Sequence, residues 1–270
     1  MNFIRTLSIF IVTGAAMLIL LFPAGFFFLL NLLTLFRLRR PAGFVMYKLA
    51  QVWARIVIAL TGCSMTVKGR ENIPRKGGVC FVANHVGVFD IILAMTYAGR
   101  PFGFIAKKEL LFIPGINFWI LFLGGLFIDR RRPKKALKTI NRGAEHIRAG
   151  GGMLIFPEGT RSRGRGLGAF HPGALKLATQ SEAVIVPLAI AGSYEVFEKH
   201  HLVNTVPVFV SFLPPIRPEE FPPKNRKQFL ANSIRRRIAL ELSESSPFPE
   251  DHEDRPPSQD RGPEKTAGNR

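Results

Sequence analysis

The sequence predicts an α/β protein with a mixed, largely parallel sheet flanked by helices and an N-terminal membrane-anchoring helical segment. Beyond residue 62, short runs rich in Val, Ile and Phe alternate with stretches that have helical spacing. Several of those runs stop at a polar turn containing glycine, which is typical of strands at the functional edge of an α/β sheet. Before residue 62 the chain is mostly apolar, as membrane-associated helices are.

Residues 7–36 form the first apolar segment and contain no charged side chain. This segment exceeds the roughly 20 residues that a helix needs to cross a bilayer. Pro23 and Gly25 lie inside it and predict a kink or a return within the membrane. Arg5 precedes the segment and the arginines at 37–40 follow it, and the heavier second cluster favours a cytoplasmic exit.

Residues 44–60 form the second segment, in which apolar side chains recur at helical spacing around Lys48 and Arg55. This pattern predicts an amphipathic helix lying on the membrane interface. A core helix of the globular domain is the alternative interpretation. We assign residues 1–62 to membrane-anchoring helices.

Residues 63–244 carry the alternating pattern of the globular domain. Pro133 and Pro172 mark helix starts, and the glycines at 150–152 end one helix. The predicted strands are 64–68, 79–83, 102–105, 126–129, 153–156, 184–190 and 206–212. The predicted helices are 89–98, 116–123, 133–148, 172–181 and 224–242. Residues 245–270 are rich in proline and charge with little to bury, so we predict a disordered tail.

The chain carries a formal net charge of +18, which attracts polyanions or an anionic lipid surface. The long apolar segment favours the lipid bilayer as the partner. We expect no nucleic acid, because the basic residues lack the interleaved aromatics of a single-strand binder. Cys63 and Cys80 fit neither a disulfide framework nor a zinc spacing, and His200-His201 has no third ligand nearby, so we expect no metal.

His85 and Asp90 follow the apolar run 79–83, at the point where the chain turns into a predicted helix. His85 is a candidate general base, and Asp90 is a candidate partner for its second ring nitrogen. Five residues turn a helix through about 140°, so the pair meets only if His85 lies in the turn and Asp90 in the first helical turn. Taken alone, such a pair is also typical of ordinary loops and helix caps.

A second polar turn, Phe156-Pro157-Glu158-Gly159-Thr160-Arg161-Ser162, follows the next buried run. Glycine lets backbone N–H groups approach an anion closely, and the planar guanidinium of Arg161 suits a phosphate. Glu158 can hold that guanidinium or bind a substrate hydroxyl. The alternative interpretation is that Glu158 and Arg161 only pair with each other at a turn.

Two further strands end in cations. Phe127-Ile128-Asp129-Arg130 opens a basic run, from which we select Arg130 as a site residue and assign the other cations to the membrane surface. Lys107 or Lys108 can neutralise a developing oxyanion, although a solvated lysine is the common alternative. The chain has no Gly-x-Ser-x-Gly elbow, which argues against a serine acyl-enzyme.

Taken in order, four blocks of this sequence resemble the signature of the glycerolipid acyltransferases, in particular the bacterial 1-acylglycerol-3-phosphate acyltransferases of the PlsC type. The resemblance covers about residues 44–212, and Ala106-Lys107-Lys108-Glu109-Leu110 is also similar to this branch. The four blocks are Asn84-His85 with Asp90, Phe127-Ile128-Asp129-Arg130, Phe156-Pro157-Glu158-Gly159-Thr160-Arg161-Ser162, and Val184-Ile185-Val186-Pro187.

The resemblance implies transfer of a fatty acyl chain from acyl-CoA or acyl-ACP to the sn-2 hydroxyl of 1-acylglycerol-3-phosphate (lysophosphatidic acid), without an acyl-enzyme or other cofactor. The product would be phosphatidic acid. His85 would be the general base and Asp90 would fix its tautomer. Acceptor binding would fall to the remaining site residues, namely Arg130, Glu158, Gly159, Thr160, Arg161, Lys107 and Pro187.

One residue departs from the family pattern. Where this branch commonly has a lysine, the chain has His171, which is mostly neutral at physiological pH. Acylation of another lysolipid, such as lyso-ornithine lipid or a lysophospholipid, is therefore an alternative. A membrane-tethered protein that binds anionic lipid without catalysis is a second alternative. We expect the chain at the inner membrane, with its globular domain on the cytoplasmic face.

Overall fold

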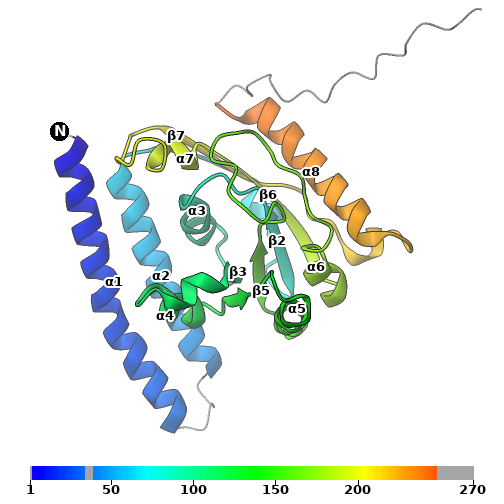
Figure 1. Ribbon diagram of the computed structural model, residues 1–270, viewed down its shortest axis with the longest axis horizontal. Helices are drawn as coiled ribbons and strands as arrows, with labels where there is room; N and C mark the ends of the chain where they lie inside the picture. Colours follow the sequence, from blue (N-terminus) through cyan, green and yellow to red (C-terminus); the bar gives the residue numbers. More distant parts are fainter. Residues whose placement is uncertain (1, 34–38, 248–270) are drawn as a thin grey trace, which may run out of the picture.

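The computed structural model describes residues 2–33 and 39–247, and it confirms the predicted fold class (Figure 1). One seven-stranded sheet has the strand order β1-β7-β6-β2-β5-β3-β4. All neighbouring strands are parallel except β6 and β7, which are antiparallel. The strands are β1 Ser64–Lys68, β2 Val79–Ala83, β3 Gly103–Lys107, β4 Leu126–Ile128, β5 Gly152–Ile155, β6 Val184–Ala191 and β7 Pro207–Phe212.

Helices flank the sheet and form the N-terminal pair. They are α1 Asn2–Leu33, α2 Arg39–Thr61, α3 Phe89–Tyr97, α4 Ile116–Phe122, α5 Pro133–Arg148, α6 Lys176–Ser181, α7 Ser193–Val196 and α8 Arg226–Ser245, with the short 3-10 helices η1 Arg70–Asn72, η2 Lys108–Phe112 and η3 Pro218–Glu220. Every predicted strand and helix has an observed counterpart. The predicted tail, apart from its first residues, lies outside the described residues.

Most boundaries agree within one to three residues, and three larger or more informative differences remain. α6 begins at Lys176 instead of residue 172, because the chain from His171 to Lys176 closes successive three-residue turns. β3 extends to Lys107, so this lysine ends a strand. The short helix α7 was not predicted, since four residues carry no detectable periodicity.

The central strands are buried on both faces, as parallel strands covered by helices are. Every residue of β2 and β5 is buried. Alternate side chains face two separate cores. Phe81 of β2 packs in the core beneath α2, α3 and α4, while its neighbour Val82 packs in the core beneath α5, α6 and α8. The period of two along β2 therefore divides the molecule into two layers on either side of the sheet.

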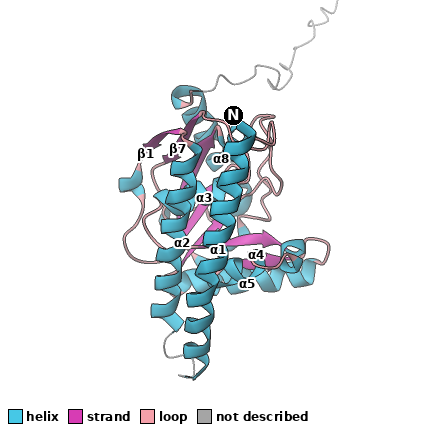
Figure 2. Cartoon of the chain, turned by 90° about the vertical axis from the view of Figure 1, so that its left-hand side faces the viewer, coloured by secondary structure: helices cyan, strands magenta, loops and turns pink. Residues whose placement is uncertain are grey.

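α1 and α2 run antiparallel along one side of the molecule (Figures 1 and 2). α1 is a single helix that continues through Pro23 and Gly25, so of the two alternatives, a kink or a return, the return does not occur at the proline. Arg5 donates to the carbonyl of Thr61 at the end of α2. A cation at this position also interacts favourably with the negative end of the helix dipole. Trp53 Nε1 donates to the carbonyl of Thr13 at 3.1 Å.

α2 combines both interpretations of residues 44–60. Its buried face, which includes Tyr47 and Ala54, joins the core beneath the sheet, while Val52 and Ile56 on another face are 54% and 45% exposed. Among the described residues, Gly43–Thr61 is long and apolar enough to cross a bilayer by length and composition. The helix therefore fixes the N-terminal pair to the sheet and still presents apolar surface. Anchoring of residues 1–62 in a membrane stays a prediction.

Candidate active site

The candidate site lies at the carboxyl edge of the sheet. β2 ends just before His85, β5 ends just before the loop that carries Glu158, β3 ends at Lys107 and β4 ends two residues before Arg130. These four strands are adjacent and parallel, so their carboxyl ends meet at one edge. The parallel topology is thus the reason that residues far apart in the sequence share a rim.

The two polar turns are joined by backbone hydrogen bonds. Ser162 N donates to the His85 carbonyl at 2.7 Å, and Arg163 N donates to the Val86 carbonyl at 3.1 Å. The histidine turn and the Glu-Gly-Thr-Arg loop therefore lie side by side. Such proximity is necessary if His85 and Arg161 are to contact the same acceptor molecule, as the resemblance implies.

His85 and Asp90 form the expected pair. His85 Nδ1 lies 2.7 Å from Asp90 Oδ2, with the histidine in the turn and the aspartate in the first turn of α3. A carboxylate at this distance holds the proton on Nδ1 and leaves Nε2 as the basic nitrogen. The imidazole stacks on the Phe156 ring at 4.0 Å between centroids, and the side chain is 19% exposed. The base is thus fixed in orientation but still reachable from outside.

Asp90 is fully buried and accepts hydrogen bonds beyond that of His85. The backbone N–H groups of Val86 and Gly87 donate to Oδ2 at 2.7 and 3.1 Å, and Ser193 Oγ donates to Oδ1 at 2.5 Å. These donors fix the orientation of the Asp90 side chain at the start of α3 and hold it against the imidazole.

Glu158 is buried and bridges two loops instead of pairing with Arg161. Its Oε1 accepts from His85 N at 2.7 Å and its Oε2 from Gly168 N at 3.1 Å. Burial raises the pKa of this carboxyl above its usual value, and the two backbone donors partly offset that effect. The side chain therefore holds the histidine turn against the loop, which is a positioning role.

The raised pKa of Glu158 predicts a pH-dependent stability difference. The folded protein holds this proton more tightly than the unfolded chain, so the group costs stability as pH rises from the unfolded value of about 4.5 through the folded pKa. As pH rises from 4.5 to neutrality, the Tm of Glu158→Gln should therefore fall less than the Tm of the unsubstituted protein. Thermal unfolding of both proteins across that window measures it, and parallel curves would contradict it.

Arg161 pairs with Glu198, which the sequence did not indicate. Arg161 Nη1 lies 2.7 Å from Glu198 Oε1, and Val88 N donates to Glu198 Oε2 at 2.6 Å. Glycine at position 87 permits this approach, because a Cβ there would lie 2.8 Å from Glu198 Oε2. Glu198 thus ties the guanidinium to the histidine turn, and Arg161 remains 32% exposed toward solvent.

Arg130 and Gly159 are in direct contact, because Arg130 Nη1 donates to the Gly159 carbonyl. Gly159 has φ 74°, and a Cβ on it would lie 3.2 Å from Arg130 Nη1 and 3.7 Å from His171 Cδ2. His171 N also donates to the Pro157 carbonyl at 3.0 Å. A guanidinium, a glycine backbone and an imidazole therefore meet at one point on the rim.

The remaining predicted site residues differ in position. Lys107 ends β3 on the same rim, with its side chain 66% exposed and Glu109 3.9 Å away. Thr160 is exposed in the loop. Pro187 is buried in β6 beside Val82, three residues below the level of His85 in the β2 register, and its carbonyl accepts from Leu213 N at 2.9 Å. The proline therefore belongs to the sheet and lies apart from the rim.

Sequence reasoning missed Ser193 and Glu198. Both follow β6 after Gly192, so the end of that strand is the only signal that would have drawn attention to them. Ser193 lies 103 residues from its partner Asp90, and Glu198 lies 37 residues from its partner Arg161. No local motif therefore links either pair.

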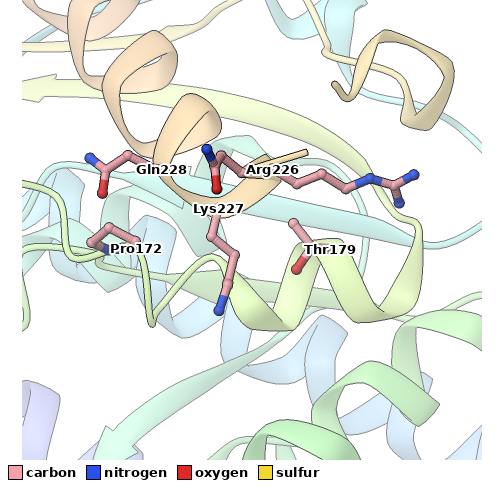
Figure 3. Close-up of a pocket in the computed structure, with 6 residues that line it drawn as sticks. Pro172, Thr179, Arg226, Lys227 and Gln228 are labelled. Atoms are coloured by element: carbon pink, nitrogen blue, oxygen red, sulfur yellow. The ribbon is translucent and has the colours of Figure 1, made fainter. Parts of the chain in front are cut away.

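A separate surface hollow of about 560 Å³ lies near the start of α8. Figure 3 shows its side chains pointing apart from one another, with Arg226 and Gln228 directed to opposite sides. None of the predicted site residues lines it. The hollow therefore contributes nothing to the chemistry at the sheet edge.

Comparison with known proteins points to the same family that the sequence motifs resemble. Residues 64–191 match the family model described as Acyltransferase. A 1-acyl-sn-glycerol-3-phosphate acyltransferase of Borreliella burgdorferi is 32% identical over 151 residues, which is 56% of this chain and 60% of that protein. The Escherichia coli protein of the same name is 33% identical over 160 residues, or 58% of this chain and 64% of its own length. The match thus spans less than two thirds of these relatives.

A solved structure matches more completely. The crystal structure of the 1-acyl-sn-glycerophosphate (LPA) acyltransferase PlsC from Thermotoga maritima superposes with a TM-score of 0.72 at 26% identity, covering 90% of this chain and 98% of that chain. Residues 64–191 are therefore similar to the acyltransferase family. The two relatives are named as 1-acyl-sn-glycerol-3-phosphate acyltransferases and the solved structure as an LPA acyltransferase, which confirms the resemblance seen in the sequence motifs.

Proposed function

We propose that the protein transfers a fatty acyl chain from an acyl thioester to the sn-2 hydroxyl of 1-acylglycerol-3-phosphate, giving phosphatidic acid. The observation that carries this proposal is the pair of backbone hydrogen bonds between the His85 turn and the loop of Arg161. These bonds hold the two turns side by side, which supports a general base at His85 acting next to a phosphate-binding cation at Arg161. The names of the relatives support the same substrate.

The chemistry follows from the His85–Asp90 pair. His85 Nε2 would take the proton of the acceptor hydroxyl while the oxygen attacks the thioester carbonyl carbon. The C–S bond then breaks, and the leaving thiolate takes the proton back from the imidazolium. A thioester is already activated, so this route needs no nucleophilic side chain. The Asp90 anion stabilises the imidazolium between the two proton transfers.

The acceptor phosphate would lie against Arg130 and Arg161, with Lys107 further along the rim. Arg161 already holds Glu198, so the phosphate would share a guanidinium that is fixed in place. A guanidinium offers two parallel donors to phosphate, which a point charge does not. Glu158, Gly159 and Thr160 would shape this acceptor site from the same loop.

Replacing Arg161 with alanine should raise KM for the phosphorylated acceptor by about 10- to 100-fold, the value of a hydrogen bond between charged groups. Turnover at saturation should change much less, because the base is intact. Steady-state kinetics with lysophosphatidic acid measures both constants. Arg163→Ala is the matched control, since Arg163 is an exposed arginine in the same loop. An unchanged KM in Arg161→Ala would place the phosphate elsewhere.

Acylation of a different lysolipid is the second candidate, and His171 favours it. Its ring lies beside Gly159 and Arg130, where the family pattern has a lysine. A neutral imidazole there would relax the demand for a doubly charged phosphate. We would compare lysophosphatidic acid, lyso-ornithine lipid and lysophosphatidylcholine as acceptors, each with acyl-CoA and acyl-ACP. Preference for lysophosphatidic acid supports the proposed function, and preference for another acceptor that reverts in His171→Lys supports the second.

The proposed location is the inner membrane, with the catalytic domain on the cytoplasmic face. A lysolipid acceptor resides in a bilayer, while acyl-CoA and acyl-ACP are soluble in the cytoplasm. The exposed apolar surface of α2 and the net charge of +18 both suit an anionic membrane. No cofactor enters this scheme beyond the thioester donor.

A further inference from the structure

The segment between β3 and β4 exposes an apolar surface that lies outside the N-terminal helix pair. Phe112, at the end of η2, is 79% exposed, and Phe118 and Leu121 of α4 are each 54% exposed. Further exposed apolar side chains of the same segment are Leu111, Ile113 and Ile116. An apolar group of this density on the surface of a soluble domain indicates a contact surface.

The exposure follows from the way α4 packs. Trp119 and Ile120 are buried and join the core beneath the sheet. Residues 118 and 121 lie on the opposite side of a helix with 3.6 residues per turn, so Phe118 and Leu121 point away from that core. Turning them inward would expose Trp119. Within the described ranges 2–33 and 39–247, nothing covers Phe118 and Leu121, so a partner from outside the domain is the cover that we consider.

The apolar face continues that of the N-terminal pair. α4 contacts α2, and Figures 1 and 2 both place it beside α1 and α2. Val52 and Ile56 on α2 are also exposed, as is Phe10 on α1. The three helices lie on the side of the molecule away from α8 (Figure 1), and each carries exposed apolar side chains.

The charges next to this face identify the partner. An exposed basic run follows β4, and Lys108 of η2 joins it through Asp129 at 2.9 Å. Apolar side chains bordered by lysine and arginine are the pattern of segments that insert into the headgroup region of an anionic bilayer. Apart from Arg130, which lies in the candidate site, the exposed cations of the run are Arg131, Arg132, Lys134 and Lys135.

We propose that η2 and α4 form a second membrane-inserting element, which docks the acyltransferase domain itself on a bilayer that contains anionic lipid. Phe112, Phe118 and Leu121 enter the headgroup region, and the basic run contacts lipid phosphates. Lys107 immediately precedes η2, so insertion places the rim of the candidate site at the lipid surface. The consequence that a lysolipid enters sideways from the leaflet rests on the proposed function, whereas the insertion does not.

An environment-sensitive fluorophore on residue 112 tests this. Full-length Phe112→Cys, in a Cys63→Ser background, would be labelled with NBD and mixed with vesicles of phosphatidylglycerol and phosphatidylcholine. Cys80 can remain, because it is fully buried and burial raises the pKa of its thiol to about 12. The matched control is Phe229→Cys on α8, since Phe229 is 50% exposed on the other face of the sheet.

Insertion predicts a blue shift of the emission at residue 112. When the vesicle lipids are brominated, most of the emission intensity at this residue should be quenched. Emission at residue 229 should stay as in water. Vesicles of phosphatidylcholine alone should give a smaller shift at residue 112. Emission at residue 112 that is unchanged while the protein co-sediments with vesicles would overturn the proposal. A shift that needs no vesicles and grows with protein concentration would also overturn it, in favour of a second copy of this chain.

The readout separates this inference from the proposed function. A protein that inserts but does not transfer acyl groups would contradict the function and keep the membrane element. Conversely, full acyl transfer with a solvent-exposed residue 112 would contradict the membrane element alone. Phe112→Ser with Phe118→Ser gives a second measurement, in which transfer to a bilayer-embedded acceptor falls while transfer to a short-chain, water-soluble acceptor is retained.

Discussion

Replacing His85 with alanine should lower acyl-transfer turnover by about 10²- to 10⁴-fold, the usual contribution of general-base catalysis. An alcohol is a weak nucleophile at neutral pH, and His85 Nε2 is the basic nitrogen that the Asp90 contact leaves available. KM for the acceptor should change little, because the cations of the rim remain. Release of free thiol from acyl-CoA in purified membranes measures both constants.

Folding of His85→Ala must be shown separately, because its ring stacks on Phe156. A matching Tm and the same sedimentation with membranes would establish it. His200→Ala is the matched control, since His200 is exposed. Ordinary turnover in a folded His85→Ala protein would remove this histidine from the mechanism.

The Asp90→Asn variant is expected to lose turnover by a similar factor of about 10²–10⁴, for a different reason. An asparagine whose amide nitrogen takes the Oδ2 position can donate to His85 Nδ1, and it then no longer accepts from the backbone N–H groups of Val86 and Gly87, which contact that same oxygen. That donation favours the tautomer with the proton on Nε2, which cannot act as a base. The nitrogen chemical shifts of labelled histidine report the tautomer directly, and retention of the Nδ1–H form would contradict this explanation.

Ser193→Ala provides the graded comparison for Asp90. It removes one neutral donor from a fully buried carboxylate, so turnover should fall by about 10-fold, less than in Asp90→Asn. Ser193 is itself fully buried and cannot touch the substrate, so KM should stay the same. A rise in KM without loss of turnover would mean that the serine supports acceptor binding instead.

The strand pattern could be predicted because it is local. β1 and β2 begin and end at the predicted residues, 64–68 and 79–83. Buried parallel strands need continuous apolar residues, and glycine or polar turns must follow them. α6 was predicted four residues too long, since Pro172 is compatible with a helix start and also with the turns that form there.

The candidate site was predictable only where its partners are close in the chain. His85 and Asp90 are five residues apart, so a turn followed by a helix brings them together. Glu158 and Arg161 are also neighbours, yet each pairs elsewhere, the first with backbone groups of other segments and the second with Glu198. Proximity along the chain therefore identified the His85–Asp90 pair, whereas the Glu158–Arg161 contact, which the sequence left open, does not form.

By itself the sequence determined the α/β class, the order of the strands along the chain and the residue types that can carry acyl transfer, because periodicity and turn chemistry depend on neighbouring residues. Tertiary structure alone decided which loops touch. The parallel arrangement of β2, β5, β3 and β4 aligns their carboxyl ends. β6 also pairs with β2, so the segment after β6 brings Ser193 to Asp90 and Glu198 to Arg161. It also decided that α2 serves both the core and the surface, since burial depends on what packs against a helix and not on its sequence alone.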